Sequence, residues 1–495
     1  MKYLFLLASL GVATTGPAWS QRLAYTVEPA GQATDKLRVT LTYQTADTTQ
    51  TTFHYPTNFW GETNLENCLT ELQANMPLQR ETTGDWVVVT VRHRPGQRVR
   101  LRYTIRPDQH DTLRNERTFR PIIEQGYFHV YGFALFMKPL RYWASEQDQQ
   151  KVRVQWRLPK SMPFLSSLQP QTASRVQVTG RRSLLESSMF LGGKLQLQAL
   201  PVGQTQVWFA TRPFRHFQVD SAARHLQLAV QAQRAFWQDP GPPSFLVSLL
   251  PTYDPWTERK HRQSVSGTAL ADSFSAFATD NKGPAIASRV DYLLFHELMH
   301  TWIGHQIRIR KEERQYWFSE GFTEYFQTQL RLRTHLLTPA QYVAELNTEV
   351  VRPLYLSPVR NVPNDSLNYQ RFWTSRDYEK LPYRRGFLFA LYLDNQLKNT
   401  TPHSLADCMR AILARSYTTN REGFTDAELL AIIRETTGFD PTPAYHRYIQ
   451  QGQLIDFVTL SLPPGLRVQP AATDSVPVFE VSGPPSEALY QFLIR

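Results

Sequence analysis

Two histidines four residues apart begin the segment HELMHTWIGH, residues 296–305. Residues at this spacing lie on one face of an α-helix, about one turn from each other, so the imidazoles of His296 and His300 can reach one metal ion. Glu297 follows the first histidine and points beside that metal, where its carboxylate can take a proton from a metal-bound water. The pattern predicts a helix that binds a metal ion and carries a general base.

The downstream segment WFSEGFTEYF, residues 317–326, supplies a carboxylate for a third ligand. Position in the sequence favours Glu320 as this ligand. Glu324, one turn later, is the alternative ligand; otherwise it orients a histidine from behind or faces solvent. Three protein ligands and one open position are typical of a catalytic zinc site, whereas structural sites are closed by four ligands. We expect one Zn2+ per chain.

His305 invites comparison with the three-histidine zinc motif HExxHxxGxxH. The spacing excludes that motif, because Gly304 comes one residue too late and Gln306 occupies the position that the third histidine would need. Since His305 lies five residues past His300, it falls off the ligand face, and we expect it to be structural.

The first residues have the pattern of a secretory signal peptide. Lys2 precedes an apolar run, residues 3–13, and Ala18-Trp19-Ser20 resembles a cleavage site before Gln21. The run is too short to span a bilayer as a mature helix. We expect a periplasmic or extracellular protein with no integral membrane segment after cleavage.

The composition limits which partners and which kinds of metal site are compatible with the chain. The formal net charge is +11, but the arginines are scattered and several alternate with apolar residues along strands, as on solvated faces, so we expect no nucleic-acid partner. The chain has only Cys68 and Cys408, which excludes a disulfide scaffold and a thiolate zinc site. We expect two unpaired, buried thiols, with one long-range bridge as the alternative. Nothing in the sequence indicates an oligomeric state.

The hydrophobic pattern changes its period along the chain. From residue 21 to about 201 it has period two, as in Arg98, Arg100 and Arg102, which predicts a β-sandwich. One short helix is expected within it, at residues 63–72, and the aromatic run 127–137 is expected to be core.

Beyond residue 202 we expect a helix at 222–237, a strand at 245–250 and one edge strand at 267–278. A helix capped by Ser288 should follow and carry the histidines, and another should run from Glu320 to about residue 336. Further helices are expected from Thr338, at 383–397, at 404–417 and from Thr425 to Gly438.

The segments HELMHTWIG, WFSEGFTEYF and LPYRRG together resemble the aminopeptidase N clan of zinc metallopeptidases, whose motif set is HExxH, a distal glutamate and a tyrosine. WFSEGFTEY is similar to the glycyl aminopeptidase branch in particular, although that branch's PDZ module is not found here. The resemblance covers residues 205–455. It implies a multidomain α+β chain, which we divide into a signal segment (1–20), an N-terminal β-sandwich (21–201), a thermolysin-like α/β zinc catalytic domain (202–337), a helical domain (338–456) and a C-terminal tail with strand-like segments (457–495).

The resemblance also implies roles for residues that spacing alone does not single out. The hydroxyl of Tyr383 would stabilise the oxyanion of the tetrahedral intermediate, and Tyr378 is a weaker candidate. The substrate would be a peptide or protein, lying along the strand that contains Gly267, Thr268 and Ala269.

Two departures separate this chain from the clan. Nineteen residues (301–319) lie between His300 and Glu320, one more than in aminopeptidase N. The strand expected to read GxMEN, whose glutamate holds the substrate's free amine, reads GTALAD, with Leu270 in place of the glutamate. Asp272 comes two residues later and so is expected on the same strand face.

The sequence thus predicts an exported zinc metallopeptidase in which Glu297 activates water. Two alternatives stay open. One is a true aminopeptidase in which Asp272 anchors the substrate amine. The other is a non-catalytic peptide-binding protein built on a peptidase scaffold.

Overall fold

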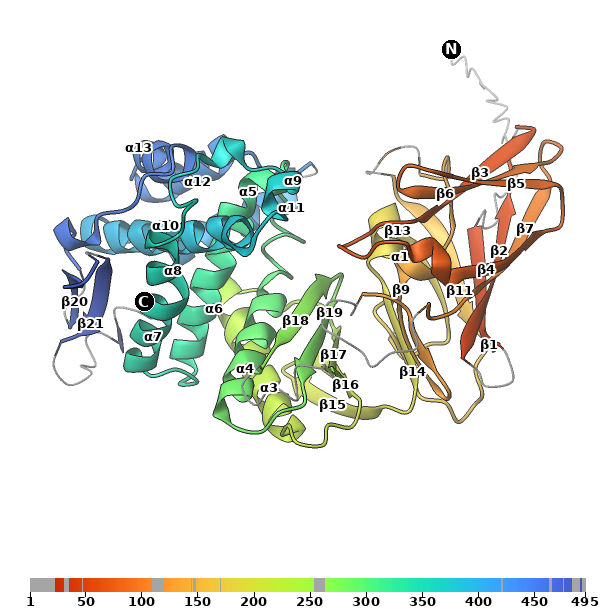
Figure 1. Cartoon of the computed structure of the whole chain (residues 1–495), viewed down its shortest axis with the longest axis horizontal. Helices are drawn as coiled ribbons and strands as arrows, with labels where there is room; N and C mark the ends of the chain where they lie inside the picture. The colour runs from red at the N-terminus through yellow and green to blue at the C-terminus, as the bar shows by residue number, and fades with distance from the viewer. Residues whose placement is uncertain are drawn as a thin grey trace, which may run out of the picture.

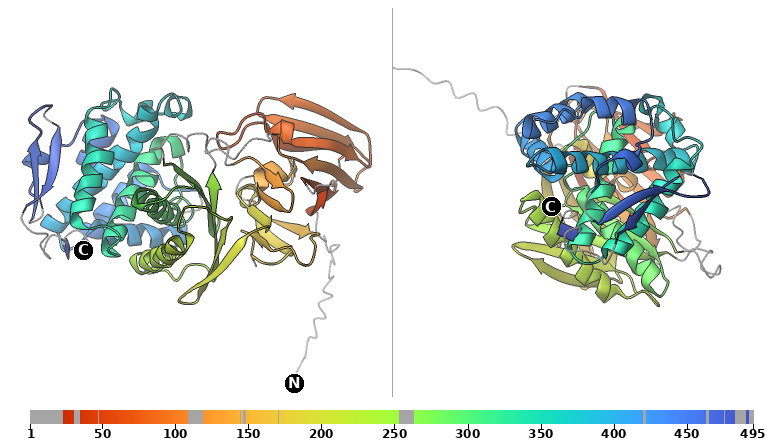
Figure 2. Two further views of the ribbon diagram at one scale, coloured as in Figure 1. Left: turned by 60° about the horizontal axis from the view of Figure 1, so that its bottom comes forward. Right: turned by 90° about the vertical axis from the view of Figure 1, so that its left-hand side faces the viewer.

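The computed structural model describes residues 23–491 apart from 31–34, 47, 109–118, 144, 146–147, 170, 253–262, 420–421, 463–464, 475 and 483–489 (Figure 1). The expected signal segment lies outside the described residues. Strands fill one end of the molecule and helices the other, and a mixed sheet with two helices lies between them, as both views in Figure 2 also show. The mixed α+β architecture with a helical C-terminal region agrees with the prediction.

The strand-rich end contains three sheets. The largest has the order β13-β11-β1-β2-β7-β4, and the others have the orders β10-β3-β6-β5 and β12-β14-β9-β8. Their strands are β1 (Leu23–Ala30), β2 (Lys36–Gln44), β3 (Gln50–Pro56), β4 (Leu69–Ala74), β5 (Leu78–Thr83), β6 (Trp86–Arg92), β7 (Arg98–Ile105), β8 (Ile122–Glu124), β9 (Tyr127–Tyr131), β10 (Lys138–Pro139), β11 (Gln150–Trp156), β12 (Phe164–Ser166), β13 (Arg175–Gly180) and β14 (Met189–Gly193). Two short helices, α1 (Gly132–Leu135) and α2 (Arg182–Glu186), lie among them.

The period-two pattern is confirmed in these strands. In β7 the side chains of Arg98, Arg100 and Arg102 are exposed, while the residues between them are buried. The aromatic run is core as expected, since every residue of β9 is buried. The helix expected at 63–72 is wrong: only Leu65–Cys68 forms a 3-10 turn, and the chain continues as β4 because its backbone pairs with β7.

The central sheet has the order β15-β16-β17-β19-β18. It contains β15 (Gln196–Val202), β16 (Thr205–Thr211), β17 (Ser244–Thr252), β18 (Val265–Leu270) and β19 (Ser273–Thr279). The single strand expected at 267–278 is wrong, because this segment forms an antiparallel hairpin of β18 and β19. Asp272 lies in its two-residue turn with a φ of 48°, a left-handed conformation that Asp tolerates better than most residues. Asp272 is therefore not on a strand face with Leu270.

Helices α3 (Val219–Trp237) and α4 (Pro284–Met299) pack against each other next to this sheet. The predicted cap at Ser288 is wrong by one turn. The helix begins at Pro284, whose missing N–H costs nothing at the first helical position, and Gly283 precedes it with a φ of 103°.

The helical end contains α5 (Glu312–Ser319), α6 (Gly321–Arg333), α7 (Pro339–Glu345), η4 (Leu346–Val351), α8 (Arg352–Tyr355), α9 (Tyr369–Phe372), α10 (Arg376–Thr400), α11 (Leu405–Thr419), α12 (Asp426–Thr437), α13 (Thr442–Tyr445) and η6 (His446–Gln450). The capping box of Thr425 and Glu428 and the left-handed Gly438 are confirmed. A second capping box begins at Thr338. The tail forms the hairpin β20 (Leu466–Pro470) and β21 (Pro477–Val481).

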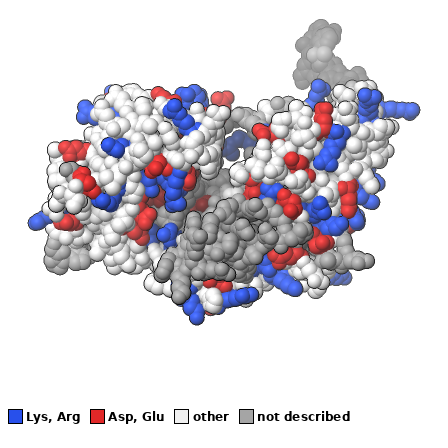
Figure 3. Space-filling view, in the orientation of Figure 1, with Lys and Arg blue, Asp and Glu red and all other residues white. Residues whose placement is uncertain are grey.

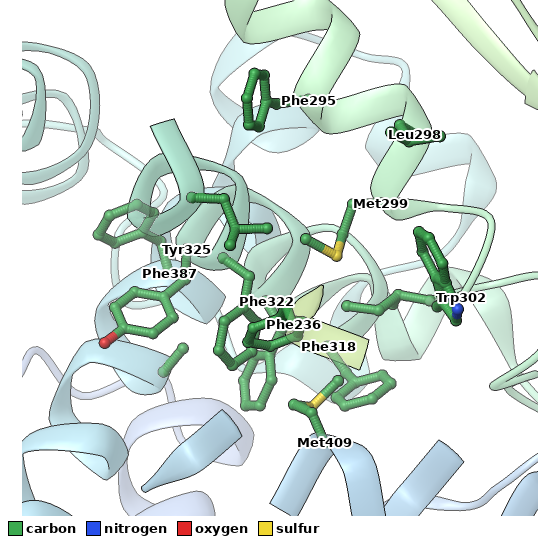
Figure 4. Close-up of a cluster of buried hydrophobic side chains, with 14 of the residues drawn as sticks. Phe236, Phe295, Leu298, Met299, Trp302, Phe318, Phe322, Tyr325, Phe387 and Met409 are labelled. Atoms are coloured by element: carbon green, nitrogen blue, oxygen red, sulfur yellow. The ribbon is translucent and has the colours of Figure 1, made fainter. Parts of the chain in front are cut away.

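A shared core fixes the orientation of α4. Its side chains Phe295, Leu298 and Met299 are buried in one cluster with residues of α3, α5, α6, α10 and α11 (Figure 4). Because the apolar residues between the two histidines face this cluster, the imidazoles are turned to the opposite side of the helix.

Cys68 and Cys408 are both buried and unpaired, as expected. Burial raises the pKa of each thiol to about 12, so both stay protonated at neutral pH. Among the described residues, no helix combines the length and the apolar character needed to cross a bilayer.

Candidate zinc site

Three side chains from two neighbouring stretches of the helical region converge on one point. His296 lies in the last turn of α4 and His300 at its C-cap, while Glu320 lies at the junction of α5 and α6. The Nε2 atoms of the two histidines are 3.1 Å apart, and each is 3.5 Å from Oε2 of Glu320. A triangle with these sides has a centre about 2 Å from all three atoms, which is the length of zinc bonds to nitrogen and oxygen.

Each imidazole has an acceptor oxygen near its second nitrogen, but only that of His300 makes a hydrogen bond. Nδ1 of His300 lies 3.0 Å from the carbonyl oxygen of Ile303, which favours the tautomer with a free lone pair on Nε2. Nδ1 of His296 lies 3.5 Å from Oε1 of Glu324, and Glu324 in turn accepts a hydrogen bond from the hydroxyl of Tyr292. Oε2 of Glu320 thus lies with the two Nε2 atoms, while Glu324 lies on the Nδ1 side of His296.

The electrostatics of the cluster suit a cation. Burial alone would lower the pKa of His300, but the adjacent Glu320 outweighs it and raises that pKa to about 9. Burial opposes ionisation of Glu320, yet the two imidazoles hold its pKa far below the usual range. Oε2 of Glu320 is buried and has no hydrogen-bond partner among the described residues. An ionised, orphaned carboxylate oxygen facing two imidazole nitrogens fits a divalent metal ion, and this is the one such cluster among the described residues.

Glu297 is buried beside this cluster and directly behind the edge strand β18. A Cβ atom on Gly267 would lie 2.9 Å from Oε1 of Glu297 and 3.0 Å from the carbonyl oxygen of Ser275. Burial raises the pKa of Glu297, although the nearby histidines pull it down. A side chain at position 267 would therefore displace the carboxylate of Glu297. Glycine is needed here because of these contacts, since its φ is not in the left-handed region.

We expect Gly267→Ala to lower kcat by about tenfold or more while zinc content is unchanged. The new methyl group has no room unless Glu297 or β19 moves. Since the sequence predicts Glu297 as the general base, its displacement by about 1 Å is expected to cost about 10²-fold in rate. Steady-state kinetics with parallel metal analysis measure this. An unchanged kcat would show that the carboxylate does not need this clearance.

Tyr383 lies on α10 beside a close helix crossing that the sequence did not reveal. Gly321 on α6 and Gly386 on α10 touch, and a Cβ on either would overlap the opposite backbone. Tyr383 lies one turn before Gly386, and its hydroxyl interacts electrostatically with Glu320. Burial, followed by the charge of Glu320, raises the pKa of Tyr383 well above its usual value, so its hydroxyl keeps its proton. It lies inside α10 rather than at a helix start, because Ser375 caps the helix eight residues earlier. Tyr378 lies in the first turn of α10.

Tyr131 on β9 interacts electrostatically with Glu297, which sequence patterns did not indicate. Burial raises the pKa of Tyr131, and the charge of Glu297 contributes to the shift. Its ring lies 5.8 Å from that of Trp60, which is 37% exposed. The only sequence signal was the aromatic run that we interpreted as core.

The remaining candidate site residues lie outside the metal cluster. The side chain of Asp272 accepts a hydrogen bond from Gln169 at 3.3 Å, and its pKa, which burial raises, responds to that amide but to no group of the zinc site. Leu270 is buried in the core of the strand-rich end. His305 is not part of the metal cluster; it contacts the backbone of Ala269, and burial lowers its pKa to about 4.

Comparisons with known proteins agree with the motifs. The sequence model of the M61 glycyl aminopeptidase family matches residues 290–364, which include both histidines and Glu320. An aminopeptidase N family protein from Idiomarina loihiensis is similar in structure, with a TM-score of 0.73 at 16% identity over 94% of this chain and 82% of that chain. The M1 zinc metallopeptidase from Deinococcus radiodurans gives a TM-score of 0.52 at 16% identity over 88% of this chain and 94% of its own, and a mutant of it has been solved with a Tyr-Ser-Ala substrate. The resemblance to the aminopeptidase N clan, with a glycyl aminopeptidase character, is confirmed.

Proposed function

We propose that this protein is an exported zinc-dependent peptidase that hydrolyses peptide bonds with Glu297 as general base. The observation that carries the proposal is the convergence of two Nε2 atoms and one carboxylate oxygen within 3.5 Å of each other. The matching family, and the peptide bound by the Deinococcus enzyme, support the reaction class. Export rests on the signal-like first twenty residues and gives a periplasmic or extracellular location.

His296, His300 and Glu320 would hold a Zn2+ ion, which supplies a Lewis acid for the substrate carbonyl and lowers the pKa of water to about 7. Glu297 takes the proton of the attacking water and delivers it to the leaving amine as the C–N bond breaks. Tyr383, which stays protonated, donates a hydrogen bond to the developing oxyanion.

The edge strand β18 provides a place for the substrate backbone. Among the described strands it pairs with β19 alone, so the backbone groups of its other edge, apart from the Ala269 group that His305 contacts, can pair with an extended peptide. Gly267, Thr268 and Ala269 are half-buried there, and Glu297 lies behind Gly267. A peptide added along β18 would therefore pass beside the base.

We expect Tyr383→Phe to reduce kcat by about 10²-fold, the usual cost of losing one oxyanion donor, with little effect on KM. The substitution keeps the ring that packs against Lys380, whose Nζ lies 4.3 Å from the ring centroid. Kinetics with a single peptide substrate measure the effect, and equal zinc content in both proteins is the control. A kcat equal to that of the unmodified protein would remove Tyr383 from the reaction.

Peptides with free and with acetylated N-termini distinguish the peptidase from the alternative aminopeptidase. Asp272 lies in a turn and is bonded to Gln169, so we expect it to make no ion pair with a substrate amine and we expect both peptides to be cleaved. Complete resistance of the acetylated peptide, together with loss of activity in Asp272→Asn, would support the aminopeptidase. Bound zinc without cleavage of any member of a mixed peptide pool would support the non-catalytic alternative.

A further inference from the structure

The outer face of the six-stranded sheet is strongly cationic. This outer face, formed by the side chains of β13, β11, β1, β2, β7 and β4 that point away from the core, carries eight cations and two acids. The cations are Lys36, Arg38, Arg98, Arg100, Arg102, Lys151, Arg153 and Arg175, and the acids are Glu28 and Glu71. Figure 3 shows Lys and Arg side chains together with Asp and Glu side chains on the strand-rich end.

The strand register arranges these charges as two walls with a floor between them. One row across the sheet runs Arg153, Ala24, Thr42, Arg100. The next row runs Gln155, Thr26, Thr40, Arg102. In these two rows Arg100 and Arg102 of β7 stand opposite Arg153 and Gln155 of β11, while β1 and β2 between them carry only small hydroxyl and methyl groups; the next row of the same two strands carries Glu28 and Arg38.

The dimensions follow from sheet geometry. Neighbouring strands are about 4.8 Å apart, so the walls on β7 and β11 are separated by about 14 Å, and successive outward residues on one strand are about 6.8 Å apart. Arg98, Arg100 and Arg102 thus span about 14 Å along one wall. The result is a shallow trough that runs along the strands.

Most of these cations have no acidic partner within the described part of the chain. Glu71 pairs with Lys36, and Glu28 pairs with Arg38 and with Arg157, which follows β11. The three arginines of β7 are exposed and none of them makes an ion pair with another described residue. Like charges held in such rows repel each other, which an anionic ligand would relieve.

We propose that this trough binds a linear acidic polysaccharide, with its carboxylate or sulfate groups on the arginine walls and its hydroxyls on the threonine floor. Charge complementarity and the interleaving of Thr and Gln with Arg favour a hydrated polyanion. Membrane-surface sites combine cations with apolar anchors, and single-stranded nucleic acids stack on aromatic rings. The large exposed hydrophobic residues of the described chain all lie outside these strands. The site is distant in sequence from the zinc cluster and does not depend on hydrolysis.

The test compares binding of polygalacturonate to the mature protein and to the triple variant Arg98→Gln, Arg100→Gln, Arg102→Gln. We expect the variant to bind at least about tenfold more weakly, with a smaller dependence of affinity on salt, because three fewer counterions are released. Neutral dextran should not bind either protein. Since these side chains point into solvent, melting temperature and circular dichroism should be unchanged.

The matched control removes the same charge elsewhere, with Arg224→Gln, Arg434→Gln and Arg447→Gln, all exposed positions on helices. We expect the affinity of this control variant to change by no more than about twofold. It loses the same net charge as the first triple variant, but its trough is unchanged. Equal weakening in both triple variants would overturn the proposal. Binding to phosphatidylcholine–phosphatidylglycerol vesicles without binding to polygalacturonate would assign the face to lipid headgroups and overturn it as well.

Discussion

Replacement of Glu297 by glutamine should remove nearly all peptide hydrolysis while the protein keeps its zinc. The amide has the size of the carboxylate and fits the same space behind Gly267, so the fold should be unaffected. It cannot accept the proton of the attacking water, and loss of a general base typically costs about 10² to 10⁴-fold in rate. We expect kcat to fall by that factor and the zinc content to stay at one per chain.

Single-turnover kinetics and elemental analysis of the same preparation check this result. Glu313→Gln is the matched control, because Glu313 lies in the first turn of α5 on the chain leading to Glu320 but is not part of the cluster. It should leave both quantities unchanged. Turnover by Glu297→Gln at the rate of the unmodified protein would take Glu297 out of the mechanism.

His300→Ala should abolish both zinc binding and hydrolysis. His300 contributes one of three atoms around a point about 2 Å from each, so its loss leaves two ligands, too few for a stable catalytic site. Removal of the imidazole also leaves Glu320 buried without one of the two groups that keep it ionised. We therefore expect a lower melting temperature as well as complete loss of activity.

His305→Ala is the control for this effect, since His305 lies five residues away but outside the metal cluster. Its ring contacts the backbone of Ala269 on the edge strand, so KM can rise, but zinc should remain bound. Equal zinc loss in both variants would mean that the whole segment, rather than His300 as a ligand, determines metal content.

The cluster of His296, His300 and Glu320 could be predicted because much of its geometry is local. Two histidines four apart on one helix share a face whatever surrounds them, and the third ligand lies at the start of the helix after next. The same is true of the capping boxes at Thr338 and Thr425, which depend on contacts between residues three apart. Alternation along β7 likewise indicated correctly which of its side chains are buried.

The wrong predictions concern features that depend on contacts between distant segments or on the conformation of a single turn. The expected helix at 63–72 became β4 because β7 pairs with it, and propensity alone does not indicate that partner. A left-handed Asp272 divides one expected strand into two and takes its carboxylate away from the strand face. The contact of Gly321 with Gly386 has no signature in the sequence, because it joins helices that are far apart in the chain.

Titration of Zn2+ into metal-free protein, with hydrolysis of one peptide followed at each step, shows whether one bound zinc ion is required for activity. We expect activity to rise linearly and to stop rising at one zinc per chain, and we expect no activity to return in the variants His296→Ala, His300→Ala and Glu320→Ala. Full hydrolysis by the metal-free protein, or recovery in all three variants, would contradict it.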